Sequence, residues 1–226
     1  MKSAWLYLLI LFSVNVLQAE EFHPYNVKSG KITFEKKKYF MDTKLHVASD
    51  GTTTKSRINP SYVEEEITYY WDNYGDVAYE VSYQISKFGG KLLPKKVKKY
   101  EKLWKGNYRY YYNVKKKKVS IDPFYKRNRC IENAYKVNGC FKIMHSKALF
   151  IANSVIQNKQ VKYYKESESN DYYLWNGLIL RDMSYSTKKR NGKYKRFEPN
   201  REKIAVKIEE NIKINASVFK PRWLNK

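Results

Sequence analysis

The sequence predicts an α+β fold that is rich in β-structure: a curved, open antiparallel sheet, or half-barrel, with helices across its concave face. Aromatic residues make up 16% of the chain, including 22 tyrosines, and such residues favour half-buried strands. Asn-Gly pairs at 176–177 and 191–192 lie between strand-like runs, which is the strongest short signal for a β-hairpin. Two stretches with helical spacing of apolar residues, 94–105 and 143–158, are expected to supply the helices.

The chain begins with a pattern typical of a secretory signal peptide. A single early lysine precedes an apolar run from Ala4 to Leu17, which ends at Gln18 and Ala19. The run is shorter than the roughly 20 apolar residues of a membrane span. We therefore expect a signal peptide at 1–19, a single β-rich domain at 20–226, and a periplasmic or secreted protein; an uncleaved N-terminal anchor is the alternative.

The strongly positive charge of the chain has two interpretations. The 45 lysines and arginines outnumber 22 acidic residues, which gives a net charge of +23. Such a surface attracts anions over about 8–10 Å. One interpretation is solubility alone, and the other is an anionic membrane surface or envelope polymer. Nucleic acid is an unlikely partner for an exported protein.

The two cysteines, Cys130 and Cys140, are predicted to form a disulfide bond in an oxidising compartment. In the chain-entropy model, closing so small a loop stabilises the fold by roughly 2–3 kcal/mol. A redox or metal-binding pair is the alternative, but the spacing is not C-x-x-C.

Strands are predicted through much of the N-terminal half. They cover residues 31–40 and 44–48, followed by a polar loop at 52–60 and two further strands split near Gly75. Alternating apolar residues in the last strand predict one buried face. These residues are Val77, Tyr79, Val81, Tyr83 and Ile85.

Residues 94–105 are expected to form a basic amphipathic helix. Pro94 suits a first helical turn, and Val97, Tyr100 and Leu103 recur at helical spacing. Such a helix packs on a sheet with its lysines in solvent, or lies on an anionic membrane. The lysines of its polar face are Lys95, Lys98, Lys99, Lys102 and Lys105.

A hairpin with a basic tip is predicted at 108–125. Its turn carries Lys115, Lys116, Lys117 and Lys118. Tyrosines beside lysines can bind single-stranded nucleic acid. Charged hairpin tips also discourage aggregation between sheet edges, which is the simpler interpretation here.

A second, more apolar helix is predicted at 143–158, laid across the inner face of the sheet. Its broad apolar face requires substantial burial. The C-terminal part then reads as antiparallel strands at 171–175, 178–186, 193–198 and from 204 onward. The apolar face of the helix contains Met144, Ala148, Ile151, Ala152 and Val155.

The C-terminal segments resemble a group of bacterial periplasmic proteins with the LolA/LolB-like lipoprotein carrier fold. The resemblance rests on "YYLWNGLILRDM" at 172–183, on "YNVKSGKITFE" at 25–35, and on a spaced pattern in the tail. It implies an open, curved sheet with helices over its concave side and space for acyl chains between them. The tail pattern consists of Ala205, Ile208, Asn211, Ile214, Phe219 and Pro221.

No catalytic motif is present in the sequence, so we expect no enzymatic activity, cofactor or metal. The histidines His23, His46 and His145 are scattered, and there is neither an H-E-x-x-H motif nor a nucleophile elbow. Glu64 and Glu66 would share a strand face, and paired carboxylates can perform acid–base chemistry, but nearby lysines offer a simpler role. A hydrolase assembled from distant residues remains the alternative.

The sequence thus favours a non-enzymatic binding protein for an acyl chain, a lipid or a lipidated protein. The expected ligand contacts are Trp175, Tyr173 and Ile179 from the hairpin, with Ile151 and Val155 from the second helix. For Trp175, a packed core ring is the simpler interpretation. Lysines would attract the anionic headgroup. The alternative function is a structural or assembly protein of the cell envelope with a filled core.

Overall fold

Most strands of the protein belong to one antiparallel sheet. A computed structural model describes residues 25–39, 42–47, 49–50, 53–58, 61–85, 87–88, 91–92, 96–106, 108–122, 145–190 and 193–225. The strands of the sheet are β1 (Gly30–Tyr39), β4 (Ser61–Asp72), β5 (Val77–Gln84), β8 (Val97–Lys105), β9 (Tyr108–Asn113), β10 (Lys118–Asp122), β11 (Leu149–Ile156), β12 (Lys159–Glu166), β13 (Asn170–Trp175), β14 (Leu178–Arg190) and β15 (Lys193–Glu210).

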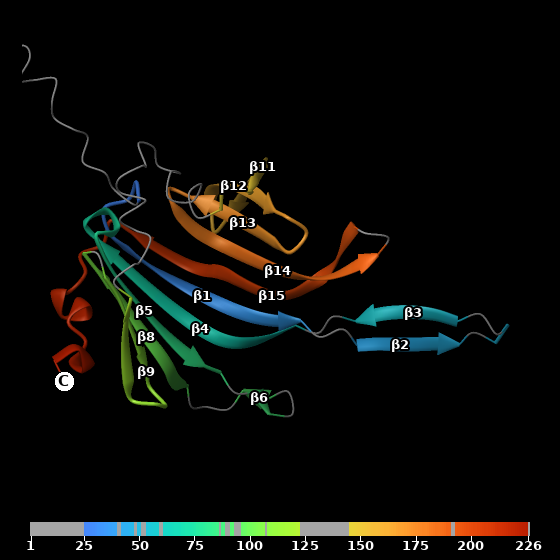
Figure 1. Ribbon diagram of the computed structural model, residues 1–226, viewed down its shortest axis with the longest axis horizontal. Helices are drawn as coiled ribbons and strands as arrows, with labels where there is room; N and C mark the ends of the chain where they lie inside the picture. Colours follow the sequence, from blue (N-terminus) through green and yellow to red (C-terminus); the bar gives the residue numbers. More distant parts are fainter. Residues whose placement is uncertain are drawn as a thin grey trace, which may run out of the picture.

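The sheet has eleven strands in the order β10-β9-β8-β5-β4-β1-β15-β14-β13-β12-β11. It is twisted and curved, with β10 and β11 at its two edges (Figure 1). Within the described residues, these two edge strands do not pair with each other, so the sheet is open.

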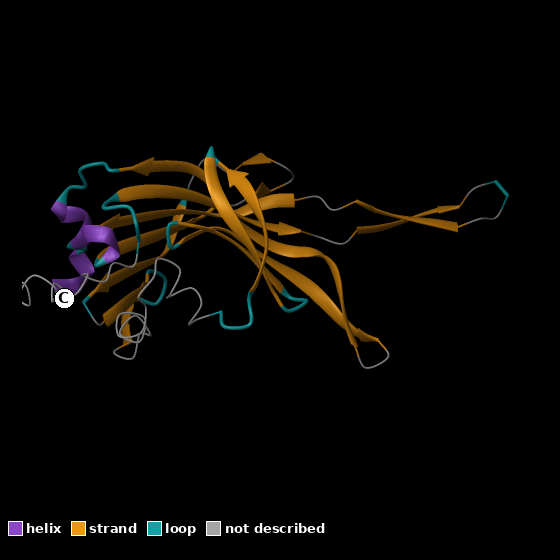
Figure 2. Ribbon diagram, turned by 90° about the horizontal axis from the view of Figure 1, so that it is seen from above, coloured by secondary structure: helices purple, strands orange, loops and turns teal. Residues whose placement is uncertain are grey.

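Two small hairpins and three short 3₁₀ helices complete the described structure. The hairpin of β2 (Asp42–Val47) and β3 (Thr53–Ile58) extends away from the main sheet (Figures 1 and 2). The second pairs β6 (Lys87–Phe88) with β7 (Lys91–Leu92). The helices are η1 (Asn73–Gly75), η2 (Ala216–Phe219) and η3 (Arg222–Asn225).

The predicted α+β class is wrong, because both predicted helices are strands. Residues expected to form the basic helix are β8, which pairs with β5 and β9. Two lysines of β8 meet carboxylates on other strands: Lys102 contacts Glu80 on the adjacent β5, and Lys99 contacts Glu65 on β4, one strand further away. These tertiary contacts override the helical spacing. In the described residues, no helix crosses the sheet (Figure 2).

The second predicted helix is the edge strand β11. Gln157 and Asn158 both have positive φ, at 48° and 60°, and turn the chain from β11 into β12. β11 contains the β-branched residues Ile151, Val155 and Ile156, which suit a strand better than a helix. The segment therefore ends the sheet instead of covering it.

The hairpin at Asn176 and Gly177 is confirmed. Their φ values of 47° and 86° allow a two-residue turn between β13 and β14. Residues 191–192 lie outside the described residues, but their neighbours Arg190 and Lys193 pair as hairpin partners. The prediction of a polar loop at 52–60 is wrong, since this segment contains β3.

Several predicted features lie outside the described residues: the signal peptide at 1–19, Cys130, Cys140 and Lys95. Of the helices that the structure describes, none has the length and apolar character needed to cross a membrane.

The main apolar core covers one face of the sheet, which we call the inner face. It is the face of Ile32 and Phe34 on β1, and it continues through their cross-strand partners on β4 and β15. Trp71 is fully buried there, and its indole N–H donates to the Val27 carbonyl at 3.0 Å. Gly30 lies directly against the Trp71 ring, with no room for a Cβ.

The opposite, outer face is also covered, by the C-terminal tail. Phe219 and Trp223 pack with Leu103 of β8, and the Trp223 indole donates to the Glu101 carboxylate. Because the core covers the inner face and the tail packs on the outer face, β5 has buried residues on both faces, whereas one buried face was predicted. Val81 is buried on one side, whereas Ala78, Glu80 and Ser82 are buried on the other.

We predict that Gly30→Ala lowers the free energy of unfolding by roughly 1–3 kcal/mol or more. An added Cβ would lie 2.3 Å from the Trp71 ring and 2.5 Å from the Glu209 carbonyl oxygen. Urea unfolding measures the change.

The matched control is Gly106→Ala. Gly106 has positive φ, at 54°, and an added Cβ meets nothing within 4 Å, so only backbone strain of about 1 kcal/mol is expected. If Gly30→Ala lowers the free energy of unfolding no more than Gly106→Ala does, the close packing of Gly30 on Trp71 is not the cause of the effect.

Candidate functional site

The inner face changes from apolar to charged along its strands. On β1, Ile32 and Phe34 are followed by Lys36 on the same face, opposite Glu65 of β4 and Lys203 of β15. The charge continues onto β5 and β8. We call this region the charged patch, and it consists of Lys36, Glu65, Glu80, Ser82, Lys99, Tyr100, Lys102 and Lys203.

Glu65 is the centre of the first group of contacts in the charged patch. Its side chain is 1% exposed, and it accepts hydrogen bonds from Lys36 at 2.9 Å, Lys99 at 2.5 Å and Ser82 at 2.8 Å. Burial alone would raise the pKa of Glu65, but these donors outweigh it and lower the pKa to about 2. The carboxylate is therefore charged at neutral pH and holds both lysines in place.

Glu80 organises the second group. Its carboxylate accepts hydrogen bonds from Lys102 at 2.8 Å, from Lys203 at 3.4 Å and from the Tyr100 hydroxyl at 3.1 Å. Burial alone would raise the pKa of Glu80, but the positive charges of Lys203 and Lys102 lower it to about 2. Burial, together with the nearby carboxylates Glu80 and Glu65, raises the pKa of the Tyr100 phenol, so this hydroxyl remains a neutral donor.

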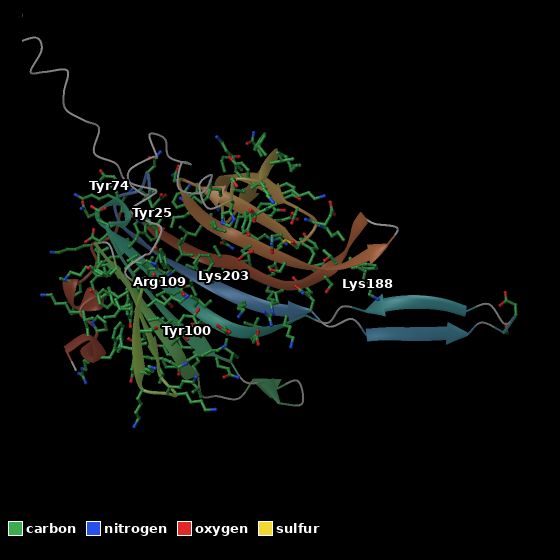
Figure 3. All side chains as sticks on the ribbon, in the orientation of Figure 1. Tyr25, Tyr74, Tyr100, Arg109, Lys188 and Lys203 are labelled. Atoms are coloured by element: carbon green, nitrogen blue, oxygen red, sulfur yellow. The ribbon has the colours of Figure 1, made fainter. Side chains whose placement is uncertain are left out.

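Lys203 and Tyr100, both labelled in Figure 3, come from strands on opposite sides of β5, and both contact Glu80. Lys203 reaches across β1 and β4 to do so, because β15 is three strands away from β5 in the sheet. Strands in a flat sheet lie about 4.8 Å apart, so this contact requires a long side chain and a sheet that bends toward its inner face.

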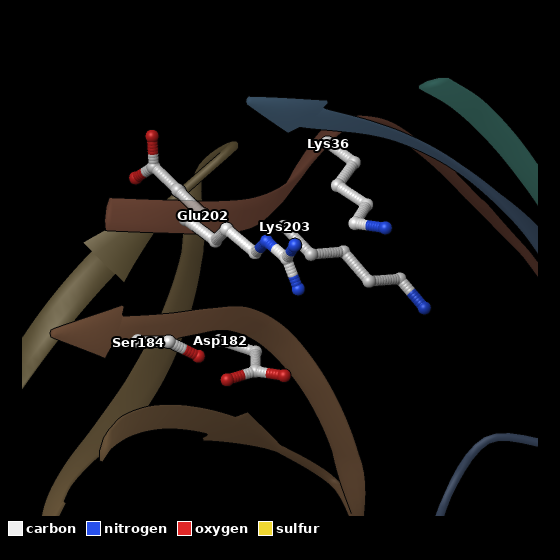
Figure 4. Close-up of a pocket in the computed structure, with 6 residues that line it drawn as sticks. Lys36, Asp182, Ser184, Glu202 and Lys203 are labelled. Carbon is white, nitrogen blue, oxygen red and sulfur yellow. The ribbon is translucent and has the colours of Figure 1, made fainter. Parts of the chain in front are cut away.

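A pocket of about 200 Å³ lies beside the charged patch (Figure 4). β1 contributes Lys36 to it, and the other lining residues come from β14 and β15. These are Asp182, Ser184, Arg201, Glu202 and Lys203.

Glu202 adds little negative charge to the pocket, because its carboxylate is turned away from the ammonium groups of Lys36 and Lys203 (Figure 4). It is paired with Arg181 at 2.6 Å and accepts a hydrogen bond from the Tyr39 hydroxyl at 2.5 Å. Burial and this bond raise the pKa of Tyr39 to about 12.

The remaining charges leave the pocket cationic. Arg201 is exposed and forms no ion pair with the described acidic residues. Burial raises the pKa of Asp182, although Lys203 and His145 oppose the rise. Three basic residues, Lys36, Arg201 and Lys203, thus line the pocket together with the Asp182 carboxyl group and the Ser184 hydroxyl, and the ammonium groups of the two lysines are paired with Glu65 and Glu80. Such an arrangement can hold a phosphate, sulfate or carboxylate group.

A separate polar cluster contains a histidine but does not form a catalytic triad. His145 Nδ1 lies 3.1 Å from Glu166, which also accepts a hydrogen bond from Tyr172 at 3.0 Å. The His145 and Tyr172 rings are 4.2 Å apart. In the described part of the chain, no group of three or more His, Cys, Asp or Glu residues could hold a metal ion.

The hairpin residues predicted to contact a ligand are packed in the structure. Trp175 is 8% exposed, lies in the main core, and carries Lys159 over its ring at 5.2 Å. Tyr173 stacks on Tyr163 at 4.8 Å. Ile179 packs against a smaller buried cluster. None of these residues lines the pocket described above.

The two predicted ligand contacts from the second helix are placed elsewhere. Ile151 and Val155 are 50% and 56% exposed on β11, so they do not line an interior cleft. The physical reason is that β11 is an edge strand with one neighbour, so no second element of the described sheet covers it.

The predicted basic residues divide into two groups. Lys98, Lys99 and Lys102 pair with carboxylates around β8. The others that the structure describes are exposed in turns or at strand ends. They are Lys105, Lys115, Lys116, Lys117 and Lys118.

The sequence reasoning missed the carboxylates that organise the patch. Glu64 and Glu66 share a strand face in the sequence pattern, but the buried residue is Glu65 between them, while Glu66 pairs with the exposed Lys96. Glu80 occupies one of the alternate positions between Val77 and Ile85, which the pattern assigns to the solvent-facing side of the strand. A carboxylate in the middle of a strand rich in aromatic and β-branched residues is the signal that could have found it.

Neither a scan of protein-family models nor a search of curated proteins found a match to this chain.

We predict that Glu65→Gln lowers the free energy of unfolding at pH 7 by roughly 1–3 kcal/mol, because Lys36 and Lys99 lose their shared acceptor. The pKa of Glu65 is about 2 in the folded protein against a usual value of 4.5. Its charged form therefore stabilises the fold above pH 4.5, and this contribution is lost as the pH falls toward 2. Urea unfolding should show that the difference in the free energy of unfolding between Glu65→Gln and wild type becomes smaller as the pH falls from 7 to 2.

Glu66→Gln is the control, since the Glu66–Lys96 pair is more exposed and should contribute less than about 1 kcal/mol. If the difference in the free energy of unfolding between Glu65→Gln and wild type stays constant from pH 7 to pH 2, the carboxylate charge is not the cause of the destabilisation.

Proposed function

We propose that this is an exported, non-enzymatic binding protein that holds the anionic headgroup of a lipid in the pocket beside the charged patch. The single observation that supports the proposal most is the set of three basic residues, Lys36, Arg201 and Lys203, that line one pocket, while the Glu202 carboxylate is turned away from it and paired with Arg181.

The charged patch gives this pocket a fixed geometry. Lys36 and Lys203 are held by Glu65 and Glu80, so their side chains lose little further conformational freedom when an anion binds. Preorganised groups of this kind raise affinity by reducing the entropy lost on binding. The net charge of +23 adds a long-range attraction for anionic surfaces.

The apolar half of the inner face supports a headgroup site more than a site for an acyl chain. Ile32, Trp71 and Leu180 are each 0% exposed and pack together in the main core. Side chains of the protein itself therefore occupy this part of the face. We infer that the protein contacts the polar end of an amphiphile and leaves its chains in the membrane or with a partner.

The alternative function, a structural or assembly protein of the envelope, is favoured by a different observation. The edge strand β11 exposes Leu149 at 68% and Phe150 at 52%, which suits contact with another protein.

The proposal predicts that the protein binds phosphatidylglycerol vesicles and that the double variant Arg201→Gln/Lys203→Gln binds them about 30-fold more weakly. The estimate takes about 1 kcal/mol for each basic residue near an anionic surface. Co-sedimentation at fixed salt measures the affinity, with phosphatidylcholine vesicles as the uncharged comparison. Soluble glycerol phosphate should compete if the headgroup enters the pocket.

The matched control is Lys116→Gln/Lys117→Gln, which removes the same charge from an exposed turn. Equal weakening by the two double variants, or a lack of competition by glycerol phosphate, would indicate adsorption through overall charge and would reject the pocket as the binding site.

A further inference from the structure

The two edges of the sheet differ in how they are protected. Natural edge strands avoid pairing with other chains by means of charged residues, proline or short length. The edge strand β10 is five residues long, contains Lys118 and Asp122, and follows Lys115, Lys116 and Lys117. The other edge strand, β11, is eight residues long and has the sequence LFIANSVI, with no charge, proline or glycine.

β11 is also apolar and accessible. Leu149, Phe150, Ile151 and Val155 are 50–68% exposed. Among the described residues, β11 pairs only with β12, so no described strand occupies its outer edge. Exposed apolar side chains next to an open edge are typical of a site where another strand is added.

The hairpin register identifies which backbone groups point outward. Ile156 and Lys159 flank the two-residue turn, and in such a hairpin the flanking pair exchanges both hydrogen bonds. Hydrogen-bonded pairs alternate along antiparallel strands, so Ser154 also faces β12. The amides of Asn153 and Val155 therefore point toward the open edge.

We propose that β11 is a strand-addition site for an extended segment of a partner protein, and that this segment combines apolar and acidic residues. Backbone hydrogen bonds to Asn153 and Val155 would extend the sheet, while apolar residues of the segment cover Phe150 and its neighbours. This inference does not depend on the anion pocket.

Local charge argues for the acidic character of the partner. Residues 145–165 contain four lysines and no aspartate or glutamate; Lys159 and Lys165 pair with Glu210 and Glu168, which leaves Lys147 and Lys162 to attract an acidic partner. Lys162 is exposed and lies directly opposite Asn153 in the hairpin, and Lys147 is exposed just before β11. Alternating acidic residues on an added strand would lie near these lysines and gain attraction.

The same observations disfavour two other occupants. A second copy of the chain would bring another +23 charge and the same lysines to the contact, so pairing of β11 with itself is repulsive. A lipid surface would cover the apolar side chains but leave the outward amides of Asn153 and Val155 without partners, which is costly in hydrocarbon. An added strand would cover the apolar side chains and would also pair with the outward amides.

The test uses a fluorescein-labelled peptide of eight residues, alternating valine and glutamate, with binding measured by fluorescence anisotropy. We expect saturable binding to the full chain and at least a 10-fold loss with Asn153→Pro. Proline removes an outward amide while keeping the bonds to β12, a position where proline is tolerated in edge strands. Asn153→Ala is the matched control and should bind within about 2-fold of wild type. Circular dichroism verifies that each variant is folded.

A second measurement does not depend on altering the protein. The same peptide with N-methylated amides on the side that faces β11 cannot form the backbone hydrogen bonds to β11 and should bind at least 10-fold more weakly. Arg201→Gln should leave peptide binding unchanged.

Three results would overturn the inference. The first is peptide binding that neither Asn153→Pro nor N-methylation weakens. The second is loss of peptide binding in Arg201→Gln, which would place the peptide in the anion pocket. The third is concentration-dependent dimerisation in sedimentation velocity that Asn153→Pro abolishes while the peptide does not bind, which would make a second copy the occupant.

Discussion

The arrangement of this sheet depends on matching buried carboxylates with lysines. Glu65 and Glu80 lie on the inner face, where an unpaired charge would be very costly. Each is paired with two lysines from different strands: β1 and β8 for Glu65, and β8 and β15 for Glu80. These contacts fix which strands are neighbours and link strands that do not pair directly. They turn one end of the inner face into an ordered, cationic surface instead of an extension of the apolar core.

The apolar and charged halves of the inner face have complementary roles. Trp71, packed on Gly30, and the side chains around it hold the sheet in its curved shape. The charged half then presents Lys36 and Lys203 to a pocket in a conformation that the carboxylates have already selected. The open form of the sheet leaves two edges, and the protection of β10 contrasts with the exposed apolar surface of β11. Anion binding and strand addition would therefore use separate parts of one scaffold.

Local patterns predicted the strands and turns well where the deciding forces are local. The Asn176–Gly177 hairpin follows from residues that tolerate positive φ, and β1 and β4 follow from their content of β-forming residues. The two predicted helices failed because apolar residues at spacings of three and four also occur in strands. In β8, the packing of Leu103 beneath the C-terminal tail and the pairing of Lys99 and Lys102 with Glu65 and Glu80 decide the conformation. These partners are distant in sequence, so the spacing within residues 94–105 does not contain them.

The candidate site was harder to predict than the fold. Its members come from β1, β14 and β15, and Arg201 lies outside every motif noted in the sequence. By itself, the sequence determined a chain rich in antiparallel strands and strongly basic, because strand propensity, turn chemistry and charge are properties of individual residues and their neighbours. Only the tertiary structure decided which carboxylates are buried, which lysines surround the pocket and which strand is left at the edge. Those outcomes depend on the order of strands in the sheet, which brings together residues more than 100 positions apart, such as Glu80 and Lys203.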